Sequence, residues 1–278
     1  MMRALRRETV HGVELAVADC GQGHTLMLVH GFPLDHTIWS AQLGALAARC
    51  RVIAPDLRGF GQSGVTRGTV TMEQLADDLA VLAEALAVEV PLVLCGLSMG
   101  GYVAFQFWRK YSERVAGLIL CDTRAEADDP SAAAARRETA ERVLAEGPAG
   151  LVETMLPKLL APVSLRSRPE LVEAVRQMIL RTPPEGIAAA QRGMAVRPDC
   201  TGLLGQITCP TLVVVGQHDT ITPPEQMQRM AQAMPHARVV VIPEAGHLAP
   251  LENADAVTQA IATFLEENLR GSGSATGS

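Results

Sequence analysis

Short apolar runs alternate with longer amphipathic segments along most of the chain. The apolar runs span residues 25–30, 51–56, 91–96, 115–122, 210–216 and 237–245. Segments with apolar residues three and four positions apart span 36–49, 71–86, 99–111, 223–234 and 252–269. Such runs are typical of strands buried on both faces, and such spacing is typical of helices. The alternation predicts an α/β protein with a mostly parallel sheet and helices on both faces.

The beginning and the middle of the chain depart from this alternation. Residues 8–19 alternate apolar and polar positions, which predicts an antiparallel edge pair and brings the sheet to about eight strands. Between Thr123 and Asp199 the strand-like runs stop. Four helical segments replace them, split by Pro and Gly, at 131–146, 149–160, 169–180 and 184–195. We expect this insertion to form a helical cap over the carboxyl ends of the strands, where ligands bind in open α/β sheets.

These features divide the chain into four parts. Residues 1–123 and 201–270 form the two parts of the core, residues 124–200 form the helical cap, and residues 271–278 have the composition of a flexible linker or tag remnant.

Composition and charge narrow the class of protein. With 278 residues, 48% of them hydrophobic, the chain can bury a sizeable core. A formal charge of -6 offers no general attraction to nucleic acid or anionic membranes, so neither is an expected partner. No apolar stretch is long enough for a signal peptide or a membrane span, which predicts a cytoplasmic protein. The six cysteines form no CxxC pair, so we expect neither disulfides nor a zinc site.

The segment Gly96–Gly100, GLSMG, places a serine between glycines where a predicted strand meets a predicted helix. This is the context in which GxSxG holds a nucleophile, because a tight strand-to-helix turn points the serine hydroxyl out of the sheet and leaves no room for larger neighbours. An incidental serine in a glycine-rich turn is the alternative. The context favours Ser98 as a nucleophile.

A serine hydroxyl needs a histidine to accept its proton and a carboxylate to orient that histidine. Asp219 follows the run 210–216 and His247 follows the run 237–245, in the order Ser, acid, His that this architecture uses. All three therefore belong to loops at one edge of the predicted sheet. Asp122 is the alternative acid and His218 the alternative base. The other histidines are expected at the surface or at helix caps, and include His11, His24, His36 and His236.

A tetrahedral intermediate also needs backbone donors for its oxyanion. The amide of Met99, directly after the serine, predicts one donor. The loop after the run 25–30 predicts the other, at the amide of Phe32.

Five segments, in this order, resemble the α/β-hydrolase family: HGFPLDHTIW, DLRGFGQS, GLSMGG, GQHD and AGHLAPLE. The resemblance covers nearly the whole chain and is strongest to small bacterial carboxylesterases, enol-lactone hydrolases and cofactor-free haloperoxidases. It implies Ser98, Asp219 and His247 as catalytic residues and the amides of Phe32 and Met99 as the oxyanion hole.

The resulting hypothesis is a serine hydrolase that cleaves small to medium carboxylic esters through an acyl-enzyme, with a small-molecule ester or lactone as its partner. Lactone hydrolysis and peroxide-dependent perhydrolysis are alternatives that use the same triad. A ligand receptor with the hydrolase fold is a third, less favoured hypothesis. No cofactor or metal is expected. Gly59–Gly64 satisfies GxGxxG, but Asp56–Arg58 separates it from the strand and no helix opens after it, so we reject a dinucleotide site. The oligomeric state and natural substrate are left open.

Overall fold

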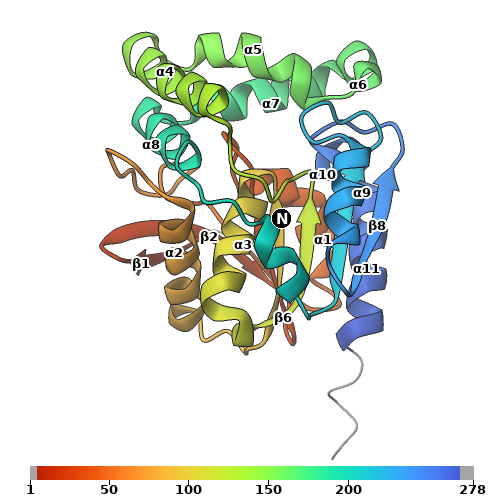
Figure 1. The fold of residues 1–278 in the computed structure, drawn as a ribbon. Coiled ribbons are helices and arrows are strands. Elements are labelled where there is room, and N and C mark those ends of the chain that lie inside the picture. The colour runs from red at the N-terminus through yellow and green to blue at the C-terminus, as the bar shows by residue number, and fades with distance from the viewer. Residues whose placement is uncertain (1–4, 270–278) are drawn as a thin grey trace, which may run out of the picture.

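Eight strands form a single sheet through the middle of the molecule (Figure 1). The computed structural model describes residues 5–269, so the linker predicted at 271–278 lies outside the described residues. The strands are β1 (Arg6–Val10), β2 (Val13–Cys20), β3 (Thr25–Val29), β4 (Arg51–Pro55), β5 (Leu92–Leu97), β6 (Val115–Cys121), β7 (Thr211–Gly216) and β8 (Ala237–Ile242). Their order across the sheet is β1-β2-β4-β3-β5-β6-β7-β8. β1 and β2 pair antiparallel at one edge and β3 to β8 run parallel, which confirms the predicted sheet.

The strand order explains why helices cover both faces. The chain moves one way across the sheet from β3 to β4 and then reverses, passing from β4 back beyond β3 to β5 and on to β6. Crossovers between parallel strands are right-handed, so this reversal places α1 (Ser40–Leu46) on the face opposite α2 (Met72–Ala85) and α3 (Met99–Tyr111). The reversal point lies between β3 and β5, where open α/β sheets form their ligand crevice.

Two predicted helices are each divided in the structure. The segment 36–49 begins as a short 3-10 turn, His36–Trp39, whose first turn is capped by the Asp35 side chain, before α1 begins. The segment 252–269 begins on the last residue of the short α10 (Ala249–Glu252) and continues as α11 (Ala254–Leu269), because the Asn253 side chain accepts the Ala256 N–H at 3.3 Å and starts a new helix. The remaining predicted core helix is α9 (Pro224–Gln232). Within residues 5–269 we find no helix with the length and apolar character that a membrane crossing requires.

Five helices between β6 and β7 form a layer at the end of the sheet toward which the parallel strands point (Figure 1). They are α4 (Pro130–Glu146), α5 (Ala149–Leu159), α6 (Pro162–Ser167), α7 (Pro169–Arg181) and α8 (Pro184–Met194). Four of them carry proline at the start, where its missing N–H would have no partner inside the helix. The sequence predicted four of these helices and missed the short α6. We call these helices the α4–α8 layer.

The α4–α8 layer meets the core at a close backbone contact. A Cβ atom built on Gly186, in α8, would lie 2.0 Å from the Gly59 carbonyl oxygen in the loop after β4. In the same helix, the Ala189 carbonyl accepts the N–H of Val70, a residue of the core, at 3.1 Å. The distance between α8 and the core therefore depends on the absence of a side chain at position 186.

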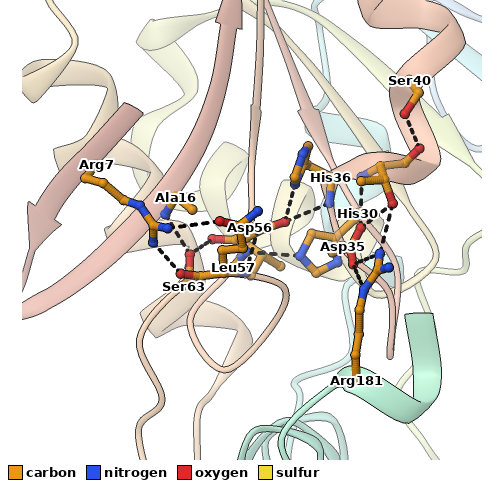
Figure 2. A network of polar contacts seen from close by, with 12 residues as sticks. Arg7, Ala16, His30, Asp35, His36, Ser40, Asp56, Leu57, Ser63 and Arg181 are labelled. Atoms are coloured by element: carbon orange, nitrogen blue, oxygen red, sulfur yellow. Dashed lines mark hydrogen bonds and ion pairs between the residues drawn. The ribbon is translucent and has the colours of Figure 1, made fainter. Parts of the chain in front are cut away.

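A buried polar network joins the loops after β3 and β4 (Figure 2). One carboxylate oxygen of Asp56 accepts both the His36 N–H at 2.8 Å and a hydrogen bond from His36 Nδ1 at 2.7 Å, and its other oxygen accepts the Gln62 N–H at 2.8 Å. His30 Nε2 accepts the Leu57 N–H at 3.0 Å, and burial lowers the pKa of His30, which keeps this ring neutral. These contacts fix the loop that carries Phe32.

The same network reaches the α4–α8 layer. Arg181, at the end of α7, donates through Nε to Asp35 at 2.9 Å (Figure 2). The adjacent Thr182 hydroxyl donates to the Pro33 carbonyl at 3.1 Å. One end of α7 is thus hydrogen-bonded to Pro33 and Asp35, which closely follow the loop residue Phe32.

His36 was expected at the surface or at a helix cap; it is buried and begins the 3-10 turn, directly after the cap residue Asp35. Its burial disfavours the charged imidazolium, but the hydrogen bond and negative charge of Asp56 outweigh burial and raise the pKa of His36. Asp35 contributes in the same direction, whereas the positive charge of Arg181 opposes it. The sequence placed His36 at a helix start but did not indicate that Asp56 would face it.

The contact at Gly186 gives a first prediction. G186A should destabilise the fold by about 1–3 kcal/mol, because α8 must move away from Gly59 to admit a methyl group. Thermal unfolding measures the change. The matched control is G150A in α5, where nothing lies within 4 Å of the new methyl group and alanine should leave the melting temperature unchanged or raise it. Equal melting temperatures for G186A and the wild type would contradict the close contact.

The His36–Asp56 pair predicts a pH dependence of stability. Because the pKa of His36 is raised in the folded protein, its contribution is complete below the unfolded pKa and is lost as pH rises through the folded pKa. The melting-temperature difference between wild type and H36Q should therefore be larger at pH 5.5 than at pH 8.5. H236Q, at an exposed histidine, should follow the wild type throughout. A wild-type to H36Q difference that does not vary with pH would refute the linkage.

Candidate active site

Ser98 lies at the sharp turn between β5 and α3. Its backbone has φ 52°, an unusual conformation for a residue with a side chain, and a Cβ on Gly96 would lie 2.2 Å from the Gly100 carbonyl oxygen. The turn is held by two hydrogen bonds of Ser98. Its N–H donates to the Cys121 carbonyl on β6 at 2.9 Å, and its carbonyl accepts the Thr123 hydroxyl at 2.7 Å. The half-buried Ser98 side chain is therefore set in a strained and well-supported position.

His247 contacts both other residues of the predicted triad. Its Nε2 lies 2.9 Å from the Ser98 Oγ, and its Nδ1 lies 2.8 Å from an Asp219 carboxylate oxygen. With Nδ1–H donating to the carboxylate, Nε2 is the acceptor for the serine proton. Three loops, after β5, β7 and β8, thus bring together the three side chains predicted from sequence.

Asp219 is held as an anion by several donors. One of its oxygens accepts the N–H groups of Ile221 and Thr222 at 2.8 and 3.1 Å, and the other accepts the Thr222 hydroxyl at 2.5 Å. Burial opposes ionisation, but the charge and hydrogen bond of His247, with the Thr222 hydrogen bonds, keep the pKa of Asp219 below its usual value. Asp219 is therefore ionised at neutral pH.

The loop with Phe32 lies against the serine. A Cβ built on Gly31 would be 3.3 Å from the Ser98 Cβ, so the next residue, Phe32, begins beside the turn that holds Ser98. Within residues 5–269 the Phe32 N–H has no hydrogen-bond acceptor. The Met99 N–H is the first of α3, where backbone N–H groups have no acceptor within the helix.

The two alternative residues lie in different environments. His218 is exposed, and its N–H donates to the Ala245 carbonyl at 2.8 Å, so it supports the loop of His247 through its backbone. Asp122 is fully buried near Asp219, but it is the Asp219 carboxylate that accepts the hydrogen bond from His247 Nδ1–H. The geometry thus favours the predicted pair over both alternatives.

Glu252 is a site residue that the sequence reasoning missed. Its two carboxylate oxygens accept the N–H of Gly246 and the N–H of Ala161, each at 2.7 Å. The Leu248 N–H also donates to the Leu159 carbonyl, at 3.1 Å. Glu252 therefore joins the loop of His247 to the α4–α8 layer. The segment AGHLAPLE contained the residue, but nothing in its pattern indicated a partner in the α5–α6 connection, 91 positions away.

Two buried trios among the described residues bring possible metal ligands within 4.8 Å of one another: Asp35, His36 and Asp56, and Asp122, Asp219 and His247. The contacts of His36 with Asp56 and of His247 with Asp219 are hydrogen bonds within these trios. We therefore assign neither trio to a metal.

Comparison with known proteins places the chain among hydrolases. The family described as alpha/beta hydrolase fold matches residues 24–254. A thermophilic esterase from Thermogutta terrifontis, solved with malate bound, has 54% sequence identity and a TM-score of 0.93, over 95% of this chain and 99% of that one. The enol-lactonase from Burkholderia xenovorans has 29% identity and a TM-score of 0.88, over 94% of this chain and 100% of that one.

A second enol-lactonase and a bromoperoxidase also resemble this chain. The 3-oxoadipate enol-lactonase 1 of Acinetobacter baylyi is 29% identical over 232 residues, which are 84% of this chain and 85% of that protein. A bromoperoxidase from Bacillus anthracis has a TM-score of 0.82 over 95% of this chain and 100% of that one, but at 23% identity this likeness bears on the fold alone. The extent of the family match, together with the fold, establishes that this chain belongs to the alpha/beta hydrolase family.

Proposed function

We propose that the protein is a serine hydrolase that cleaves small to medium carboxylic esters through an acyl-enzyme intermediate. The observation that carries the proposal is the hydrogen-bonded chain from Ser98 Oγ to His247, at 2.9 Å, and from His247 to Asp219, at 2.8 Å. This is the arrangement that acyl transfer by a serine requires, and the identity with an esterase supports it.

Each residue of this hydrogen-bonded triad has its own part in the proposed reaction. Ser98 Oγ attacks the ester carbonyl carbon while His247 Nε2 takes the hydroxyl proton, and the negative charge of Asp219 stabilises the imidazolium that forms. The amides of Phe32 and Met99 donate to the oxyanion of the tetrahedral intermediate. His247 then gives its proton to the departing alkoxide, which leaves as the alcohol. Water then attacks the acyl-enzyme while His247 takes its proton, and His247 gives that proton to the departing Ser98 Oγ as the acid is released.

The substrate range is proposed from the position of the α4–α8 layer. We assign residues 124–200 to a cap that limits access to Ser98, since the layer lies at the end of the sheet where the three loops meet (Figure 1). A covered site favours small and medium substrates over an aggregated lipid surface.

Lactone hydrolysis is the second candidate, favoured by the similarity to two enol-lactonases. A lactone is a cyclic ester, so the same steps open it, except that the leaving alkoxide stays attached to the acyl group. A preference for open or cyclic esters therefore distinguishes the two candidates. Comparing kcat/KM for acyclic esters and lactones of equal carbon number decides between them. Peroxide-dependent peracid formation, measured as monochlorodimedone bromination in acetate and peroxide, tests the haloperoxidase alternative in the same preparation.

The proposed mechanism predicts that S98A loses activity toward p-nitrophenyl acetate and butyrate. Loss of a triad nucleophile in a serine hydrolase costs about 10⁶-fold in kcat, so turnover should fall to the detection limit. A fluorophosphonate should label the wild type once and S98A not at all, as measured by intact mass. S112A, at an exposed serine after α3, is the control and should match the wild type in both assays. Undiminished turnover by folded S98A would rule out the mechanism, and ligand binding without turnover in the wild type would favour a receptor.

A further inference from the structure

A second carboxyl group, that of Asp122, is buried directly beside the triad acid. Asp122 follows β6, next to β7, and is 0% exposed. Its Oδ1 accepts the Gly216 N–H at 2.8 Å, and its own N–H donates to the Val214 carbonyl at 2.9 Å. Its backbone has φ 45°, which is unfavourable for most side chains. Asp122 is thus fixed in a strained backbone conformation at the carboxyl end of β6. The proposed mechanism gives it no role.

The other oxygen, Oδ2, has no N–H or O–H donor among the described residues. The groups that face Asp122 are the Asp219 carboxylate after β7 and the His247 ring after β8, and the three residues have ligand atoms within 4.8 Å of one another. On its own strand the neighbour is the Cys121 thiol. The nearby Arg124 donates to the Ile221 carbonyl instead. No cation of the described part of the chain is therefore paired with Asp122.

Two buried carboxylates at this separation cannot both be ionised cheaply, because like charges repel strongly away from water. Asp219 has backbone and hydroxyl donors and the adjacent His247, so it keeps the charge. Burial, followed by the negative charge of Asp219, raises the pKa of Asp122 well above its usual value. A proton on Oδ2 would give this oxygen a partner, since the Asp219 carboxylate can accept its hydrogen bond.

We propose that Asp122 is held as a neutral carboxylic acid whose Oδ2–H donates a hydrogen bond to the Asp219 carboxylate, which makes Asp122 a positioning residue for the triad acid. The inference rests on the proposed function of Ser98, His247 and Asp219. The hydrogen bond orients Asp219 and withdraws electron density from it. Asp219 is then less basic, and His247 gains less proton affinity from it than from an isolated carboxylate.

The first test compares D122N and D122A. An asparagine side chain is nearly the shape of a protonated aspartic acid, can accept the Gly216 N–H and can donate an N–H to Asp219. D122A removes the donor and should lower kcat/KM by about tenfold, the usual worth of a hydrogen bond to a charged group. D122N should recover most of that loss.

The pH profile separates a neutral from an ionised Asp122. The acid limb of kcat/KM reports protonation of His247 in the free enzyme. If Asp122 is neutral, D122N leaves the limb in place, and D122A moves it to higher pH because Asp219 becomes more basic. If Asp122 is ionised, D122N removes a negative charge near His247 and moves the limb to lower pH by about one unit, which overturns the inference. A D122A profile equal to the wild type in height and position would also overturn it.

An infrared measurement tests the protonation state without using activity. In the S98A background at pH 7, the spectrum should contain the C=O stretch of a protonated carboxylic acid that is lost in S98A/D122N. The lack of this difference would refute the inference and leave the proposed esterase function intact. Conversely, full esterase activity in S98A would refute the proposed function, while the infrared band would still report on Asp122. Thermal unfolding of each variant checks that the fold is retained.

Discussion

The hydrogen bonds of His247 to Ser98 and Asp219 depend on three loops that leave three different strands at one edge of the sheet. A parallel sheet makes such a meeting possible because the carboxyl ends of its strands share an edge. The individual loops are then held by the backbone. The Ser98 N–H donates to Cys121 on β6, and the N–H groups after Asp219 donate to its carboxylate. The relative positions of Ser98, His247 and Asp219 are therefore set by the sheet and by these hydrogen bonds.

The electrostatics of this edge follow from which carboxyl group has donors. Asp219 has two backbone N–H groups, one hydroxyl and His247, whereas Asp122 has the single N–H of Gly216. Donors that favour an anion lower a pKa, and burial without them raises it, so the pKa values of these two neighbouring aspartates are shifted in opposite directions. With Asp122 neutral, as proposed, the site carries one negative charge to balance the imidazolium that the proposed acyl transfer forms. A second charge would strengthen the attraction of His247 for its proton and delay the return of that proton to the leaving group.

The sequence predicted the sheet, most helices and the three side chains that meet, because each leaves a local pattern. Apolar runs identified the strands, GLSMG identified the turn at Ser98, and the ends of two later runs identified Asp219 and His247. The contacts of His36 with Asp56 and of Glu252 with Ala161 were not predictable in this way. Each joins segments whose separation in sequence carries no periodic signal, so the partner becomes visible only when the sheet has placed both segments side by side. The protonation of Asp122 belongs to the same class, since it depends on a neighbour contributed by another strand.

The α4–α8 layer is bonded to two of the loops that the proposed mechanism uses. Arg181 and Thr182 bind the loop that follows Phe32 through Asp35 and Pro33, and Glu252 joins Ala161 to the residue before His247. Glu252 lies almost wholly away from solvent, so its bonds are not weakened by competition with water as surface ion pairs are. Arg181 is half-exposed and contributes less electrostatically, but Thr182 supplies a buried bond at the same place. A substitution in the layer that shifts α7 or the α5–α6 connection is therefore expected to displace Phe32 or His247 as well, the proposed oxyanion donor and the proposed general base. Under the proposed function, changes in the helices assigned to the cap are therefore not independent of the positions of Phe32 and His247.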